Sequence, residues 1–286
     1  MYNGLNFVLF VKFHVKGGLS MRITALVENT SARDDCAAEF GLSLYIETRR
    51  HKILFDSGAS ALFIKNAEKL GIELSDVDLA VLSHGHSDHA GGMTAFFRLN
   101  GRARLYAREG YDLSRYDSSG RYIGVEPLLI GNPRVVKVKA PRLRLDEEVT
   151  LASYSDQPAE WPVNTYGMMV DAKGILRPEQ FMHEQYLLVN EDGQKVLFTG
   201  CSHRGICNIM AWASREGVQT VVGGFHCKDT PAAKFSQCLD PIARELEKYP
   251  VTYYTCHCTG EPQFSYLKER LDGRIRRLSG GMTFEL

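Results

Sequence analysis

The sequence predicts an α/β protein, in which helices cover the faces of β-sheets. Apolar residues switch between the two-residue period of strands and the 3.6-residue period of helices throughout the 286-residue chain, and the two element types alternate in both halves. Hydrophobic residues make up 44% of the composition, which is ample for a core. Length alone is compatible with one large or two small domains.

Residues 1–20 are interpreted as an N-terminal extension, either disordered or an additional edge strand. Their apolar stretch FVLFVKF is too short to span a bilayer, and Lys12 interrupts it. The early positive charge and small-residue cleavage site of a signal peptide are not evident. Met21 then begins a predicted strand, MRITALVE, and we expect no membrane segment.

In the first half of the chain, strands alternate with a helix. The segments 41–48 (GLSLYIET) and 51–58 (HKILFDSG) predict two strands joined by a short turn. A helix is expected over 61–71, with Ser60 capping its first turn. The segment 78–83 (DLAVLS) predicts a short buried strand that runs directly into the motif described below.

The second half begins with a less regular region. Residues 105–180 are rich in turn formers and arginines, and we expect strands and loops there that cover a site. The segment 185–200 predicts a hairpin with Asp192-Gly193 in its turn. After the hairpin we expect a helix at 204–217, a strand at 218–225, an amphipathic helix around 239–246, a strand at 251–255, and a short helix before the final MTFEL.

Charge and cysteine content narrow the class of protein. The 34 basic and 34 acidic residues balance, with a pI near 7.1, so no nucleic-acid partner is expected. The seven cysteines are an odd number, and six of them lie in the last third of the chain. This distribution does not suit a secreted disulfide framework, so we expect reduced cysteines and a cytoplasmic location.

The segment SHGHSDHAGG, at 83–92, contains three histidines and one aspartate within six residues. His84 and His86 are two apart, a spacing that points both rings the same way in an extended segment. Asp88 and His89 follow after a bend. We predict one metal ion at His84 and His86 and a second at Asp88 and His89, with zinc, manganese or iron as suitable ions.

Four residues cannot saturate two ions, so further ligands must come from elsewhere in the chain. Three later apolar strands end in suitable residues: VLFTGCSH ends in Cys201 and His203, TVVGGFH ends in His226, and TYYTCHCTG contains His257. Polar groups at successive strand ends can converge on one crevice, as ligand sites of α/β sheets do.

These motifs resemble those of a known family. HGHSDH resembles the H-x-H-x-D-H signature of the metallo-β-lactamase fold, which implies a four-layer αββα sandwich over about residues 21–286. LFDSG resembles the family's first motif, in which Asp56 would orient the metal-binding loop without binding the metal. The segments GLSLYIE, HGHSDHAGGM, TGCSHRGICNI, GGFH and CHCTG resemble a subfamily labelled dihydropterin-ribofuranosylaminobenzene-phosphate synthase-like.

The sequence departs from the family pattern after the hairpin. Many members carry TGD there, with the aspartate bridging both ions, whereas this chain has Cys201. Cys201 could bridge the two ions as a thiolate, or it could be no ligand at all, with His203 binding the metal instead. We favour His203 as the third ligand of the first ion, with His183 as a weaker alternative.

The remaining candidates are assigned from the same resemblance. His257 is similar to the family's last histidine, a ligand of the second ion. His226 is either a ligand or a catalytic group that meets the substrate or transfers a proton. Alternation along an extended segment would point Cys256 and Cys258 away from His257, so we expect both to be packing residues.

The resemblance implies a metal-dependent hydrolase with two divalent ions, most readily zinc, with manganese or iron as alternatives. A metal-bridged hydroxide would attack the phosphorus or carbonyl carbon of a small anionic ester, and we expect a phosphoester. The subfamily label suggests a pterin-related compound. Asp88 would hold a metal and accept a proton, and His226 would act beside it. A homodimer is compatible with the sequence. The arginines at 115, 121, 142 and 144 either clamp the anion or are solvated loop charges.

Other functions are kept open. An RNA or nucleotide phosphodiesterase has precedent in the fold, although the balanced charge argues against it. A di-iron redox protein would replace His86 with glutamate and carry a flavin domain, neither of which is found. A non-enzymatic metal-bearing ligand sensor is a third alternative, because Cys201 in the bridging position could silence hydrolysis.

Overall fold

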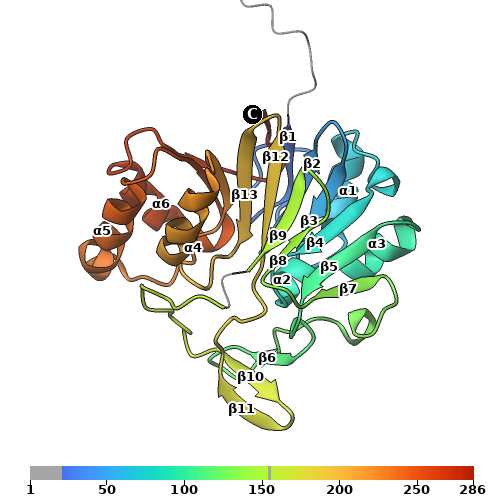
Figure 1. Ribbon diagram of the computed structural model, residues 1–286, viewed down its shortest axis with the longest axis horizontal. Helices are drawn as coiled ribbons and strands as arrows, with labels where there is room; N and C mark the ends of the chain where they lie inside the picture. Colours follow the sequence, from blue (N-terminus) through green and yellow to red (C-terminus); the bar gives the residue numbers. More distant parts are fainter. Residues whose placement is uncertain (1–20, 154–155) are drawn as a thin grey trace, which may run out of the picture.

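The computed structural model describes residues 21–153 and 156–286, and the predicted N-terminal extension lies outside them. Two seven-stranded sheets face each other, and helices cover their outer faces (Figure 1). This arrangement confirms the predicted fold class, a four-layer αββα sandwich. None of the helices in the described ranges is long and apolar enough to cross a membrane.

The first sheet is built mainly from the N-terminal half of the chain. Its strands β3, β4, β5 and β7 are parallel, whereas β17, β1 and β2 add antiparallel pairs at the other side. In sheet order the strands are β17 (Thr283–Glu285), β1 (Arg22–Val27), β2 (Ser43–Glu47), β3 (Lys52–Phe55), β4 (Leu79–Leu82), β5 (Arg104–Arg108) and β7 (Val135–Val138). The helices of this half are α1 (Leu62–Lys69), α2 (Ser87–Ala90) and α3 (Met93–Leu99).

The second sheet contains the predicted hairpin, with Asp192 (φ 50°) and Gly193 (φ 90°) in the turn. Strands β13 to β16 are parallel, and β12, β9 and β8 are antiparallel. In sheet order the strands are β16 (Ile275–Arg277), β15 (Thr252–Thr255), β14 (Thr220–Gly223), β13 (Gln194–Gly200), β12 (Tyr186–Glu191), β9 (Val149–Ala152) and β8 (Arg142–Arg144). The helices of this half are α4 (Ile206–Ala213), α5 (Phe235–Leu246) and α6 (Glu261–Lys268).

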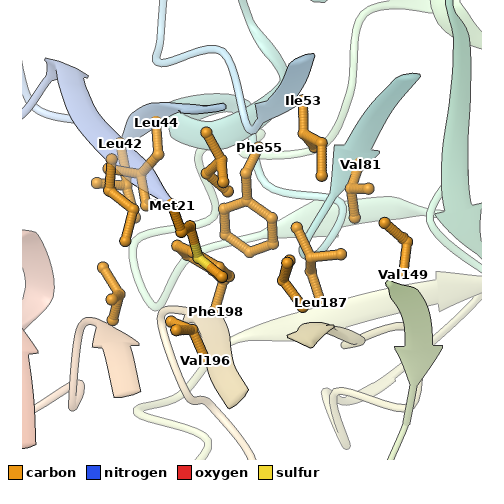
Figure 2. Close-up of a cluster of buried hydrophobic side chains, with 14 of the residues drawn as sticks. Met21, Leu42, Leu44, Ile53, Phe55, Val81, Val149, Leu187, Val196 and Phe198 are labelled. Carbon is orange, nitrogen blue, oxygen red and sulfur yellow. The ribbon is translucent and has the colours of Figure 1, made fainter. Parts of the chain in front are cut away.

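The main core lies between the two sheets (Figure 2). Alternate residues of each strand face it, as the two-residue period requires: Phe55 of β3 and Phe198 of β13 meet with ring centroids 5.9 Å apart. Their neighbours Leu54 and Leu197 point the other way, into the separate cores beneath the outer helices. The packing of both faces holds the ends of the two sheets at fixed positions relative to each other.

The predicted irregular region contributes a third, small sheet. It projects from one end of the sandwich (Figure 1) and consists of β6 (Ser114–Tyr116), β10 (Met169–Ala172) and β11 (Ile175–Pro178). The rest of this region supplies β7, β8 and β9 of the main sheets. Short 3-10 helices complete the described elements: η1 (Leu74–Asp76), η2 (Pro127–Leu129), η3 (Ser214–Glu216), η4 (Ala232–Lys234) and η5 (His257–Thr259).

Candidate metal centre

The predicted site residues follow the carboxyl ends of parallel strands in both sheets. Asp56 and His84 follow the neighbouring strands β3 and β4, whereas Cys201, His226 and His257 follow β13, β14 and β15. Because these strand ends lie at one edge of the sandwich, residues more than 170 positions apart in the chain become neighbours. Among the described residues, the side chains form overlapping clusters in which ligand atoms lie within 4.8 Å of one another.

The loop after β4 presents its side chains through a tight backbone. A Cβ atom on Gly85 would lie 2.2 Å from the carbonyl oxygen of Tyr111, so only glycine fits between the two histidines. His86 is extended (φ −100°, ψ 148°) and precedes the single turn of α2, which carries Asp88 and His89. The predicted bend therefore corresponds to a helical turn that places an aspartate and a histidine side by side.

Asp56 is fully buried and links two residues of this loop, Ser83 and His89. Its Oδ1 accepts a hydrogen bond from Ser83 N at 2.7 Å, and its Oδ2 accepts from Ser83 Oγ at 2.6 Å. The same Oδ2 lies 2.7 Å from His89 Nδ1. Asp56 belongs to none of the ligand clusters, which agrees with its predicted role of orienting the ligands.

Two sets of three side chains correspond to the two predicted ions. The first set is His84, His86 and His203, with the Nε2 atoms of His84 and His203 3.2 Å apart. The second set is Asp88, His89 and His257, in which Asp88 Oδ2 lies 3.2 Å from His257 Nε2 and 3.7 Å from His89 Nε2. Each set combines residues from both sheets, in the pairing predicted from the sequence.

The geometry favours His203 over His183 as the third member of the first set. His183 belongs to no ligand cluster of the described residues; its Nδ1 accepts from Gly85 N at 3.4 Å, and its Nε2 lies 3.5 Å from Glu179. His203 is fixed by the buried carboxylate of Glu184, which accepts from His203 N at 2.7 Å. Burial raises the pKa of Glu184 to about 7, against the opposing effect of its hydrogen bonds.

Two sulfur atoms lie at the centre. Cys201 Sγ is 3.1 Å from His89 Nε2 and forms a cluster with His257 and Cys258. The expectation that Cys258 points away from His257 was wrong, because 257–259 form a 3-10 turn rather than an extended segment. Cys256 packs in the main core as expected. The C-x-C spacing of Cys256 and Cys258 is the feature of the sequence that could have identified Cys258 as a site residue.

His226 lies beside the first set, with its ring centroid 4.2 Å from that of His203. It forms a further cluster with Cys201 and His203, and both of its ring nitrogens are buried without a hydrogen-bond partner in the described structure. Its backbone is left-handed (φ 51°) and its carbonyl oxygen accepts a hydrogen bond from Tyr166 at 2.9 Å. Both predicted roles, ligand and proton-transfer group, remain compatible with this position.

The side chains fit a cationic metal. Ser83 Oγ donates to Asp56 and therefore accepts from His84 Nδ1, 2.8 Å away, which leaves the Nε2 lone pair of His84 directed at the cluster. The contact with Asp56 aims His89 Nε2 in the same direction. Against the effect of burial, the carboxylates of Asp88 and Asp56 raise the pKa of His89 to about 9, so a metal bound there would displace a proton. Burial, reinforced by neighbouring imidazoles, lowers the pKa of His84 and His203 well below the usual value, which favours their neutral, metal-binding forms.

The four arginines proposed as an anion clamp are all engaged elsewhere. Arg115 is buried against Glu179 at 2.7 Å, and Arg121 pairs with Asp117. Arg142 pairs with Glu216, and Arg144 donates to the carbonyl oxygen of Asp146. The alternative interpretation of solvated charges suits three of them, although Arg142 and Arg144 lie on β8 and not in a loop, whereas Arg115 is structural. The irregular region still reaches the centre, because Phe181 stacks on His203 with centroids 4.3 Å apart.

Comparisons with known proteins identify the family of this chain. Residues 37–177 match the model of the metallo-beta-lactamase superfamily. A crystal structure described as a metal-dependent hydrolase of the beta-lactamase superfamily is 30% identical, with a TM-score of 0.76, and the alignment covers 93% of this chain and 99% of that one.

Two relatives come from Methanocaldococcus jannaschii. One, described as an uncharacterized protein, is 26% identical over 90% of this chain and 99% of its own length. The other is 24% identical over 85% of this chain and 89% of its own, and is named 7,8-dihydropterin-6-methyl-4-(beta-D-ribofuranosyl)-aminobenzene-5'-phosphate synthase. Its name supports the subfamily resemblance seen in the motifs. With a shared architecture, matching motifs and a relative at 30% identity along nearly its whole length, the chain belongs to the metallo-beta-lactamase superfamily.

Proposed function

We propose that this protein is a hydrolase with a two-metal centre that cleaves a small anionic phosphoester. The observation that carries the proposal is the pair of neighbouring ligand sets, each assembled from both sheets, within each of which the ligand atoms lie no more than 4.8 Å apart. Packing alone gives no reason to bury five histidines side by side, because neutral imidazoles that face one another through their lone pairs leave polar atoms unsatisfied.

In this proposal one ion is held by His84, His86 and His203. The other is held by Asp88, His89 and His257, and Cys201 lies between the two sets. The neighbouring nitrogen and sulfur atoms favour zinc over the harder manganese ion.

When bound, two such cations lower the pKa of water toward neutrality and polarise the ester oxygen that is attacked. The protein's own contribution is orientation and proton transfer. Asp88 keeps about a fifth of its side chain exposed beside fully buried histidines, so its carboxylate is placed to accept a proton from an incoming water. His226 has no partner for either ring nitrogen in the described structure, which suits donation of a proton to the leaving group.

The proposed substrate class rests on the relative named as a synthase. Its name contains a dihydropterin and a 5'-phosphate, so a pterin-related phosphoester is the first substrate to try. Aromatic side chains at the centre are compatible with a planar substrate: Phe40 is half exposed, and its ring centroid lies 4.7 Å from that of His257.

The proposal predicts that His86→Ala abolishes hydrolysis of a chromogenic phosphodiester and lowers the metal content, because one of three ligands of the first ion is lost. Metal content is measured by plasma mass spectrometry on protein loaded with zinc or manganese. His226→Ala should retain both ions and lose turnover by roughly 100-fold or more, as expected for the loss of a proton-transfer group. A matched control is His51→Gln, a histidine remote from the centre, which should change neither.

Full activity of His86→Ala would contradict the mechanism. Two further outcomes would support the alternatives. Salt-dependent binding and cleavage of RNA would favour a nucleotide phosphodiesterase. Two bound ions without turnover of any phosphoester would favour a ligand sensor. Cys201 in place of a carboxylate would then explain the absence of hydrolysis.

A further inference from the structure

His257 is held by two consecutive residues at the end of β1. Its main-chain N–H donates to Glu28 Oε1 at 2.6 Å, and its carbonyl oxygen accepts from Asn29 Nδ2 at 3.2 Å. Its ring Nδ1 lies 2.8 Å from Asn29 Oδ1. Both main-chain groups and one ring nitrogen of this histidine are therefore bound by residues about 230 positions earlier in the chain.

These contacts determine which nitrogen of His257 carries the proton. Asn29 Oδ1 also accepts from the main-chain N–H of Gly41 at 3.2 Å, and Nδ2 donates to a carbonyl oxygen, so both backbone partners fix the orientation of the amide. The oxygen must then face the ring, and His257 Nδ1 must donate to it. The Nε2 lone pair is left directed at Asp88 Oδ2, 3.2 Å away, and at His89 Nε2, 3.3 Å away.

Glu28 restrains the backbone in the same place. His257 has a left-handed backbone (φ 52°), a conformation that is unfavourable for a residue other than glycine. Glu28 is buried, and its second oxygen accepts from Thr30 N at 2.7 Å and Thr30 Oγ1 at 2.6 Å. The carboxylate is thus held with its other oxygen aimed at His257 N, which opposes relaxation of the turn.

We propose that Asn29 and Glu28 are positioning residues that preset His257 as a metal ligand, Asn29 by selecting the Nδ1–H tautomer and Glu28 by holding the strained turn. The inference rests on the proposed two-metal centre and adds to it two residues that directly follow β1, a strand that carries none of the ligands. Asp88 Oδ2 faces the Nε2 lone pair of His257 at 3.2 Å, a contact that a cation held between the two atoms would make favourable. The arrangement around His257 therefore anticipates the second ion.

The test compares Asn29→Ala and Asn29→Asp with the matched control Asn66→Ala. Asn66 is a buried amide that also holds the segment after β1, through hydrogen bonds to the backbone of Leu26 and Ala37, and none of its hydrogen bonds among the described residues is to a histidine. A cavity of about 190 Å³ borders Asn29 and His257, so the alanine substitution opens onto existing space. Zinc affinities of both sites are measured by competition with a chelator, and stoichiometry by plasma mass spectrometry.

Asn29→Ala should lower the affinity for one of the two zinc ions by roughly 10- to 100-fold and leave the affinity for the other unchanged. Asn29→Asp should retain the affinity, because a carboxylate oxygen still accepts from Nδ1, and Asn66→Ala should retain it too. Wild-type affinity in Asn29→Ala, or an equal loss in Asn66→Ala, would overturn the inference.

A second measurement does not depend on metal. In metal-free protein, ¹⁵N NMR assigns the tautomer of His257, whose signals are identified by their loss in His257→Gln. Wild type and Asn29→Asp should show the Nδ1–H form, and Asn29→Ala a mixture or the Nε2–H form. An unchanged tautomer in Asn29→Ala would refute the inference, whereas a wild-type protein that binds no ion would refute the proposed function and leave this measurement valid.

Discussion

Cys201 is the residue at which this centre departs most from the family pattern. Its sulfur lies within 4.8 Å of ligand atoms from both sets, in one cluster with His84 and His89 and in another with His257 and Cys258. Many family members have an oxygen ligand at this position. A soft sulfur ligand at the same place would favour softer ions, so this one side chain would determine the metal preference.

This interpretation predicts a spectroscopic signature. Cadmium-loaded wild-type protein should show an ultraviolet sulfur-to-metal charge-transfer band that Cys201→Ser loses and Cys207→Ser, a control in the core beneath α4, retains. Cys201→Asp should lose the band as well and shift the metal preference toward manganese, because an oxygen replaces the sulfur. A band that survives in Cys201→Ser and disappears in Cys258→Ser would assign the sulfur ligand to Cys258 instead.

At the scale of elements, the small third sheet depends on a buried ion pair. Arg115 of β6 is 2% exposed and pairs with Glu179, which directly follows β11. The guanidinium also donates to the carbonyl oxygens of Gly110 at 2.6 Å and Leu113 at 2.8 Å. The pair joins the two ends of the irregular region, and Phe181, two residues beyond Glu179, stacks on His203 of the centre.

Removal of one partner should therefore be costly. Arg115→Ala is expected to destabilise the protein by roughly 3–5 kcal/mol, because it leaves the Glu179 carboxylate buried without its partner. Replacement of both residues by apolar ones of similar size should cost less than either single change. The free energy of unfolding is measured in urea, and opening of the third sheet by limited proteolysis.

The control is Arg121→Ala, which breaks an exposed ion pair with Asp117 in the same region. It should change stability by no more than about 0.5 kcal/mol. Equal effects of the two substitutions would show that the buried pair does not hold the third sheet.

At the scale of the whole molecule, local and long-range features of the site differ in how well the sequence reveals them. His84 could be identified because its motif directly follows an apolar strand, and the strand fixes which end of the sheet it occupies. The contact of Asn29 with His257 could not be identified from the sequence, because it depends on a turn at 257–259 and on how β1 packs against that turn. Cys258 was misplaced for the same reason.

The third sheet could also not be predicted from local sequence patterns. Strand β6 pairs with β10, more than fifty residues later, across a stretch of turns with no clear period. By contrast, the hairpin of β12 and β13 and the buried face of α4 follow from residues within one short window. Patterns of neighbouring residues predicted the individual elements and the α/β class, whereas the four layers were predicted from the family resemblance.

The two sheets are joined by a titratable contact at the end of the sandwich opposite the metal centre. His51, in the turn between β2 and β3, lies 3.4 Å from Asp78 in the same sheet and 2.5 Å from Asp146 in the turn between β8 and β9 of the other. The carboxylates of Asp78 and Asp146 raise the pKa of His51 to about 9, against the effect of its partial burial.

This shift predicts how stability depends on pH. Because the pKa of His51 is higher in the folded state than the value of about 6.5 in the unfolded chain, its contribution is complete below pH 6.5 and declines as pH rises toward 9. Wild type should exceed His51→Gln in free energy of unfolding at pH 6, and the difference should shrink by pH 9.5. The comparison uses urea unfolding at equal metal loading, so that pH effects on the metal centre cancel between the two proteins. A difference that is constant over this range, or grows with pH, would show that the imidazolium of His51 does not join the sheets.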